Sequence, residues 1–195
     1  MRNNFLTYIL IIFFGLTTFS YSEEIEITSK IIEFENEGKI LIGKEDVVIK
    51  TKSGMIINAD EVFYEKNKKY LKALGNIKVI NKIKKVIIYS NEIEYFENTG
   101  QILSKGLTTA KLENKYFLKS NNLIYNTKKD LVNSKDRTEI DVDSENFINI
   151  DNFHLKINKK IISGENLEYF DNLSNKYYIK KGIYDLEKKV LLGKD

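Results

Sequence analysis

Two pairs of glutamates are the residues of this sequence that could carry acid–base chemistry. Glu92 and Glu94, or Glu165 and Glu168, could serve as the paired carboxylates of a glycosidase, which need a defined separation across a cleft. Glu92 and Glu94 flank Ile93, so an extended strand places both carboxylates on the face opposite the apolar residue. A solvated sheet face explains them better than a catalytic pair. The sequence contains no Ser-His-Asp arrangement, phosphate-cradling Gly loop or dinucleotide fingerprint, so an enzyme is the least expected class.

Metal binding is also weakly supported by the sequence. His154 is the only histidine and the chain has no Cys, so a zinc site would need carboxylates alone. Alternation places His154 opposite Phe153 and Leu155, which predicts a solvent-facing side chain. The run 141–145 resembles the start of a calcium loop, but Asn146 stands where the sharp turn needs Gly. We interpret this run as an acidic loop and expect no metal site.

The first residues predict export. Arg2 is the only charge ahead of an apolar run over residues 5–16, and small residues follow the run. This pattern is typical of a secretory signal peptide, residues 1–22, cut between Ser22 and Glu23. The mature chain is therefore expected outside the cytoplasm. The apolar run is shorter than the roughly 20 residues that span a bilayer, and an uncleaved inner-membrane anchor is the alternative.

The expected mature domain, residues 23–195, is close to electroneutral. Removal of the leader takes away one Arg and no acidic residue, which leaves 30 basic and 28 acidic residues. The lysines are scattered rather than gathered into a stripe, which argues against nucleic acid as a partner. Without Cys, the domain cannot rely on disulfides in an oxidising compartment. Its 12 Tyr and 11 Phe, with no Pro, favour a chain rich in strands.

An internal repeat of about thirty residues runs through the mature sequence. An apolar residue ends a strand-like stretch and a polar pentapeptide follows it, at spacings of 29 to 31 residues. These anchors are Phe34, Tyr64, Tyr95, Tyr125, Leu155 and Tyr184. Nine or eleven residues later comes a small or turn-forming residue, predicted to mark a bend or bulge: Gly43, Gly75, Gly106, Asp136, Gly164 and Gly193. Each repeat therefore predicts a strand, a turn and a returning strand.

Alternation within the repeats predicts the fold class. The predicted inward faces of three repeats are Asp60, Val62, Tyr64, Leu71, Ala73, Ile77 and Val79; Asn91, Ile93, Tyr95, Ile102, Ser104, Thr108, Ala110 and Leu112; and Asn121, Leu123, Tyr125, Val132, Ser134, Thr138 and Ile140. A period of two with frequent turns indicates antiparallel sheet, and no helix is expected after the leader. Six two-stranded repeats, each with one apolar face, cannot be buried separately. We therefore predict an all-β antiparallel sandwich or jelly roll, whose interior is either a filled core or a groove.

The best-defined repeat resembles the OstA-like family, whose members include the lipopolysaccharide transport protein LptA and the periplasmic N-terminal domain of LptD. The family pattern is an Ala-Asp pair, an alternating apolar residue and Tyr, then an Ala-x-Gly-Asn-apolar return strand. The chain reads Ala59-Asp60-Glu61-Val62-Phe63-Tyr64 and Ala73-Leu74-Gly75-Asn76-Ile77 at these places. Weaker copies span residues 91–108 and 121–140. They depart from the pattern through Asn91, Asn121, Asp136 and, later, Leu155.

The resemblance implies a jelly roll that is open along one side and takes lipid A acyl chains into its apolar interior. It also implies no catalysis, no cofactor, and edge-strand pairing with other jelly-roll components in a bridge to the outer membrane. The implied lipid contacts are Val62, Tyr64, Leu71, Ala73, Ile77, Val79, Ile93, Tyr95, Ile102, Leu123 and Tyr125. The same residues would serve a dry core equally well.

Several alternatives stay open at the level of sequence. The chain is expected to be either LptA-like or the N-terminal part of a longer LptD-like protein. In the second case it would be associated with the outer membrane, with a barrel and a lipoprotein as further partners. A structural or adhesin-like β-repeat, and an inner-membrane-anchored relative similar to LptC, are the other candidates.

Overall fold

The structure, a computed structural model, describes residues 25–143 and 145–194. These residues form a sixteen-stranded antiparallel sheet and one 3-10 turn, η1 (Ile157–Lys159), which the sequence did not predict. The strands are β1 (Ile25–Thr28), β2 (Ile31–Glu35), β3 (Ile40–Thr51), β4 (Met55–Glu65), β5 (Tyr70–Asn81), β6 (Val86–Phe96), β7 (Gln101–Ser104), β8 (Leu107–Leu112), β9 (Tyr116–Asn121), β10 (Ile124–Asn126), β11 (Leu131–Ser134), β12 (Thr138–Asp141), β13 (Phe147–Lys156), β14 (Ile161–Phe170), β15 (Lys176–Asp185) and β16 (Val190–Lys194). The predicted signal peptide and its cleavage position lie outside the described residues. Within these residues no helix is long and apolar enough to cross a membrane.

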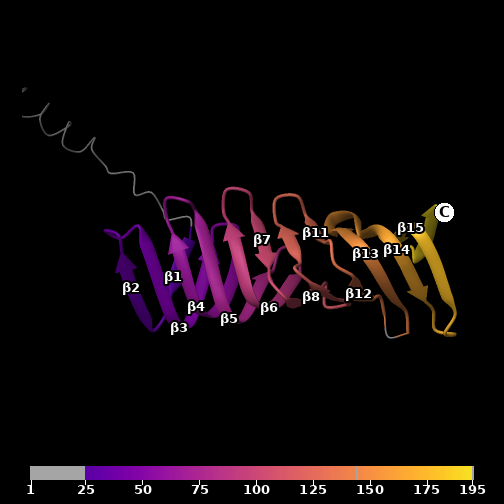
Figure 1. Cartoon of the computed structure of the whole chain (residues 1–195), viewed down its shortest axis with the longest axis horizontal. Coiled ribbons are helices and arrows are strands. Elements are labelled where there is room, and N and C mark those ends of the chain that lie inside the picture. Colours follow the sequence, from indigo (N-terminus) through magenta and orange to yellow (C-terminus); the bar gives the residue numbers. More distant parts are fainter. Residues whose placement is uncertain (1–24, 144, 195) are drawn as a thin grey trace, which may run out of the picture.

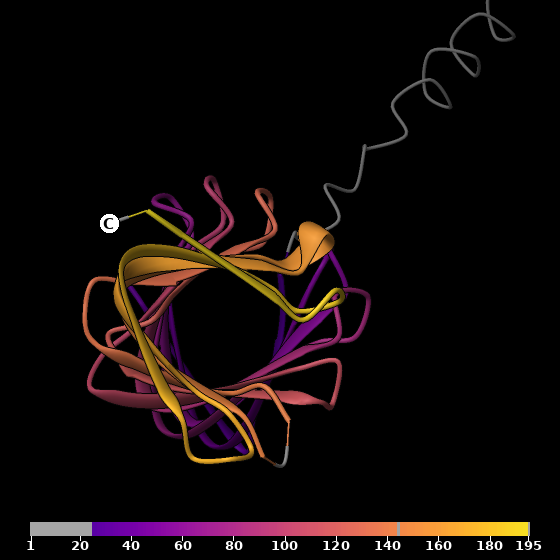
Figure 2. The same cartoon turned by 90° about the vertical axis from the view of Figure 1, so that its right-hand side faces the viewer.

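The sheet is a meander in which each pass of the chain pairs with the pass before it and the pass after it. Some passes are divided into two strands. The second half of β6 pairs with β7 and its first half with β8, and β13 pairs with β11 and β12 in the same way. The passes lie side by side along the long axis (Figure 1) and wrap around a common interior when seen down that axis (Figure 2). The predicted antiparallel all-β roll is confirmed, and the number of repeats stays a prediction.

The long passes β3 to β6, β13 and β14 bend near their midpoints, where the pairing register shifts. Examples are the shifts between Lys44 and Val47 in β3 and between Leu74 and Ile77 in β5. The bends divide the sheet into two walls that meet along a line of corners. Wall 1 carries the turns at 36–39, 66–69, 97–100, 127–130, 157–160 and 186–189, and wall 2 carries those at 52–54, 82–85, 113–115, 142–146 and 171–175.

The Ala-Asp and Gly-Asn residues of the sequence motif build one of these corners. The Asn76 amide on β5 donates a 2.8 Å hydrogen bond to the carboxylate of Asp60 on β4. Gly75 has a φ of +73°, and a Cβ there would come within 2.9 Å of the Cβ of Asp60. Glycine is thus required for two reasons, its backbone conformation and the space that the carboxylate occupies. Asn122 and Asp136 form an equivalent 2.9 Å contact at a later corner.

Three polar residues were wrongly predicted to face inward. Asp60, Asn91 and Asn121 are exposed. On the strands that carry them, consecutive inward residues are three apart across the corner instead of two, as in the step from buried Ala59 to buried Val62. The pairing register between β4 and β5 shifts at the same point, between Asn58 and Glu61. The period of two holds within each arm and changes phase at the bend.

The corner predicts different costs for two glycine substitutions. Gly75→Ala should lower the free energy of unfolding by about 2–4 kcal/mol, because a positive φ and an overlap with Asp60 act together. Gly38→Ala is the matched control, since Gly38 has a φ of +79° and nothing within 4 Å of an added Cβ. Gly38→Ala should lower the free energy of unfolding by about 1–2 kcal/mol, the cost of a positive φ alone. Urea unfolding of both variants measures the difference, and equal losses would contradict the proposed corner.

Candidate functional site: the apolar interior and its seam

The apolar side chains of both walls face one interior. Of the eleven implied lipid contacts, ten are at most 5% exposed and belong to a single hydrophobic cluster, and Tyr64 is partly buried against that cluster. The ten are Val62, Leu71, Ala73, Ile77, Val79, Ile93, Tyr95, Ile102, Leu123 and Tyr125. The structure therefore brings the predicted set together, in a packed core. Their contact with lipid stays a prediction.

The turns of the two walls meet along one side of the roll, which we call the seam. Among the described residues three ion pairs cross it: Lys84 with Asp130 at 2.9 Å, Glu113 with Lys160 at 3.2 Å, and Asp143 with Lys189 at 3.1 Å. Each pair joins a wall 2 turn to the last residue of a wall 1 turn. The wall 1 residues share a left-handed backbone conformation, with φ between 50° and 55°. The cross-seam ion pair therefore recurs at the same position of successive wall 1 turns.

Buried hydrogen bonds reinforce the seam from inside. The Asn81 amide donates to the Tyr125 hydroxyl at 2.9 Å, and the Tyr116 hydroxyl donates to the Leu186 carbonyl at 3.2 Å. Burial raises the pKa of Tyr125 well above its ordinary value, against a smaller lowering by Asn81 and with a contribution from nearby Asp130. The phenol therefore stays neutral at physiological pH and keeps its place in the hydrogen-bond network.

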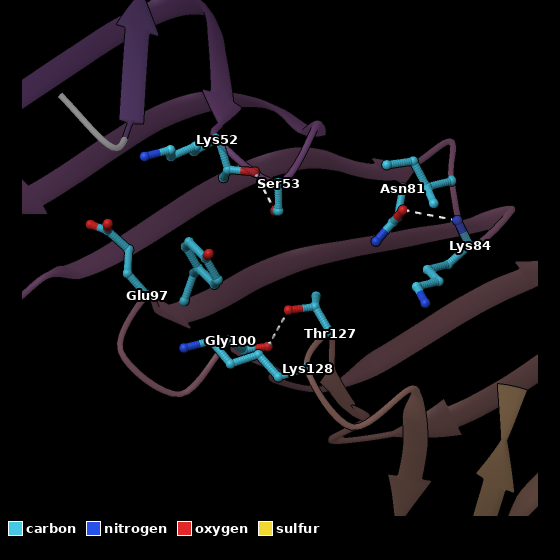
Figure 3. Close-up of a pocket in the computed structure, with 11 residues that line it drawn as sticks. Lys52, Ser53, Asn81, Lys84, Glu97, Gly100, Thr127 and Lys128 are labelled. Atoms are coloured by element: carbon cyan, nitrogen blue, oxygen red, sulfur yellow. Dashed lines mark hydrogen bonds between the residues drawn. The ribbon is translucent and has the colours of Figure 1, made fainter. Parts of the chain in front are cut away.

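A pocket of about 410 Å³ opens on the seam between the turns at 52–54 and 82–85 on one side and those at 97–100 and 127–130 on the other (Figure 3). Its lining residues are Thr51, Lys52, Ser53, Asn81, Ile83, Lys84, Tyr95, Glu97, Gly100, Thr127 and Lys128. Tyr95 is the one implied lipid contact among them. The pocket therefore connects the surface with the edge of the hydrophobic cluster.

The apolar interior also reaches the surface at the N-terminal end of the roll. Ile32 and Phe34 on β2 pair with Gly43 and Leu41 of β3, which are buried and face inward. Residues paired across a ladder share a face, so Ile32 and Phe34 lie on the inner face as well. They are nevertheless 41% and 62% exposed. β2 is the edge strand of wall 1 at this end.

The candidate chemical residues take the positions that alternation predicted. Lys105 bonds to Glu94 at 2.6 Å and to Glu92 at 3.1 Å. Hydrogen bonds from Lys105 and then Lys72 hold the pKa of Glu92 below its usual range. His154 is exposed, as expected. Glu168 binds Arg137 at 2.6 Å. These carboxylates are used in ion pairs between strands.

Sequence reasoning missed the seam residues. Their signal was available, because the partners are separated by 46 or 47 residues, which is one and a half repeats, and always carry opposite charges. The run 141–145, interpreted as an acidic loop, supplies one of them. Asp143 accepts bonds from the Asn146 side chain at 2.6 Å and from Lys189 at 3.1 Å.

The chain is similar in structure to a known transport component. A solved structure of LptH from Pseudomonas aeruginosa, described as the LptA-homologous periplasmic component of the conserved lipopolysaccharide transport device, aligns with a TM-score of 0.48 and 17% identity. The alignment covers 56% of this chain and 80% of LptH. No protein-family model matches the sequence, and no curated protein matches it.

The buried seam bond predicts a selective loss of stability. Tyr125→Phe leaves the Asn81 amide without its acceptor in a buried position, so the free energy of unfolding should fall by about 1–3 kcal/mol. Tyr178→Phe is the control, because Tyr178 is 60% exposed and its hydroxyl bonds to Asn166 at the surface. It should change stability by less than about 0.5 kcal/mol. Chemical denaturation compares them, and a neutral Tyr125→Phe would refute a stabilising role for this bond.

Proposed function

We propose that this chain is a periplasmic module that shelters the acyl chains of lipopolysaccharide in its apolar interior and joins like domains edge to edge toward the outer membrane. The observation that carries the proposal is the exposure of Ile32 and Phe34 on the inner face of β2. An interior sealed for stability alone has no need to present apolar side chains at its mouth. The sequence resemblance to the OstA-like family supports the same role, with residues 1–22 as the leader.

The energetics favour a passive shelter. Each CH₂ group removed from water contributes about 0.8 kcal/mol, so a long acyl chain is strongly driven into an apolar channel. The lining on both walls is apolar over the length of the described sheet, as the single hydrophobic cluster from Ile25 to Leu186 indicates. Transfer along such a lining needs neither a bond-making step nor a cofactor.

The two ends of wall 1 are suited to pairing with each other. Within residues 25–143 and 145–194, β2 and β16 each pair on one side only, and both carry exposed apolar residues, such as Ile31 at 42% and Leu192 at 60%. β2 runs toward its turn and β16 runs away from its turn, so β16 of one copy beside β2 of another would continue the antiparallel meander. Edge pairing would satisfy the free N–H and C=O groups of both strands.

A structural β-repeat is the second candidate, and the tight packing of the interior favours it. Ten of the implied lipid contacts are almost fully buried by other protein atoms. If the same packing persists in solution with lipid present, the module would act as a spacer or adhesin-like scaffold. The two functions differ in whether hydrocarbon reaches the inner face.

Photo-crosslinking at two neighbouring positions distinguishes them. A photoreactive amino acid at Ile32, on the inner face, should form adducts with lipopolysaccharide because the acyl chains pass this mouth. The same photoreactive amino acid at position 31 should form few adducts. Ile31 has nearly the same exposure as Ile32, 42% against 41%, but faces outward. Adducts are measured by gel shift and mass spectrometry. Equal labelling at both positions, or none at either, would contradict a lipid-accessible interior.

The edge-pairing part of the proposal has its own test. The Lys30 amide donates to the Glu45 carbonyl at 3.0 Å, so alternate residues of β2 bond to β3 and the amide of Glu33 points to the free edge. Glu33→Pro removes that donor and should abolish concentration-dependent association of the mature protein, measured by sedimentation. Glu33→Ala, which loses only the 3.1 Å ion pair with Lys44, should associate like the wild type. A wild-type protein that stays monomeric at high concentration would refute pairing between copies.

A further inference from the structure

We infer that the seam pocket beside Gly100 binds the phosphate-bearing head group of an amphiphile whose acyl chain enters the interior past Tyr95. The inference rests on the proposed function and adds to it a lateral entrance with a preference for an anionic head. Its basis is a break in the series of contacts that fasten the seam, together with the charge and apolar character of the pocket at that break.

The series of seam ion pairs is interrupted where a glycine takes the position of the charged residue. The last residues of successive wall 1 turns are Gly100, Asp130, Lys160 and Lys189, all with φ between 50° and 66°. The last three carry side chains that reach across to wall 2. Gly100 has no side chain to do so, and its backbone forms no hydrogen bond with the turn 52–54 in the described residues. The position that carries the seam ion pair in the later turns therefore has no side chain where the pocket lies.

The architecture places these two turns opposite each other in the same way as the fastened ones. The ion pairs Lys84–Asp130 and Asp143–Lys189 each span 46 residues, and the same step from Gly54 leads to Gly100. Figure 3 shows Lys52 and Ser53 on one side of the pocket and Gly100, Thr127 and Lys128 on the other. A ligand in the gap would contact both walls.

The pocket has an excess of positive charge. Its charged lining residues are Lys52, Lys84 and Lys128 against Glu97. Lys84 forms an ion pair with Asp130, and Glu97 accepts a 2.7 Å hydrogen bond from Tyr64. Within 25–143 and 145–194 no carboxylate lies in ion-pair distance of Lys52 or Lys128. Lys128 donates to a backbone carbonyl, that of Asn98, at 2.7 Å. Two ammonium groups at one opening fit a phosphate, which presents several acceptor oxygens.

Hydroxyl groups and apolar surface complete the match to an amphiphile. The Thr51 and Ser53 hydroxyls lie 2.9 Å apart on one side of the opening, and the Thr127 hydroxyl bonds to the Gly100 carbonyl at 3.0 Å on the other. Tyr95, 5% exposed, joins the pocket to the hydrophobic cluster, and Ile83 is 74% exposed at the rim. A free anion would use the lysines alone. A lipid phosphate monoester that carries acyl chains would also contact the apolar surface of the pocket.

Binding of defined lipids to the full mature protein tests the inference. The probes are phosphatidic acid, diacylglycerol with the same acyl chains, and inorganic phosphate, measured by competition with a fluorescent fatty acid. Wild-type protein should bind phosphatidic acid about tenfold tighter than diacylglycerol and should bind inorganic phosphate weakly. The double variant Lys52→Glu/Lys128→Glu should lose about that tenfold preference while keeping its affinity for diacylglycerol.

A matched control separates the pocket from general charge. Lys135 and Lys180 are exposed and do not line the pocket, so Lys135→Glu/Lys180→Glu changes the net charge equally and should stay within about twofold of wild type. Unchanged unfolding midpoints confirm that all variants are folded. An unaltered lipid preference in Lys52→Glu/Lys128→Glu, or inorganic phosphate bound as tightly as phosphatidic acid, overturns the head-group site but leaves the shelter intact. If wild-type protein binds neither lipid, the proposed function fails too.

Discussion

The mid-strand corner is the constraint on which this structure depends. A meander with one apolar face can remove that face from water only by folding onto itself, and it must do so without breaking the hydrogen-bonded ladder. The corner achieves this with an extra residue and a polar contact between neighbouring passes, such as Asp60 with Asn76. The two walls, the buried interior, the seam and the open ends all follow from repeating that bend along the sheet.

Local alternation in the sequence was sufficient to predict the antiparallel class and to select residues that meet in the interior. It failed at three corners, because consecutive inward residues there are three apart instead of two and nothing in the local pattern marks that change of phase. Asp60, Asn91 and Asn121 were assigned to the wrong face for this reason. Alternation also could not separate a packed core from an accessible one, since both need the same apolar side chains.

The seam was beyond local patterns for a different reason. Its contacts join turns that lie one and a half repeats apart in the sequence. Which turns meet depends on the coiling of the sheet between them, which local patterns do not contain. The side chains nevertheless follow a rule. Asp130 is acidic and meets a basic partner, whereas Lys160 and Lys189 are basic and meet acidic partners. A shift of one turn would bring like charges together at one position, Asp130 with Glu113 or Lys160 with Lys84, and such pairs disfavour the shifted register.

The meander has a consequence for how the chain acquires its structure. Because each pass pairs with its immediate predecessor, every new strand needs only a short loop to be closed, which keeps the contact order of the ladder low for an all-β protein. A chain that emerges N-terminus first during synthesis can therefore assemble hairpin by hairpin. Each seam contact would form later, only after three further passes have emerged. Closure of the two walls at the seam would therefore lag behind growth of the sheet by three passes.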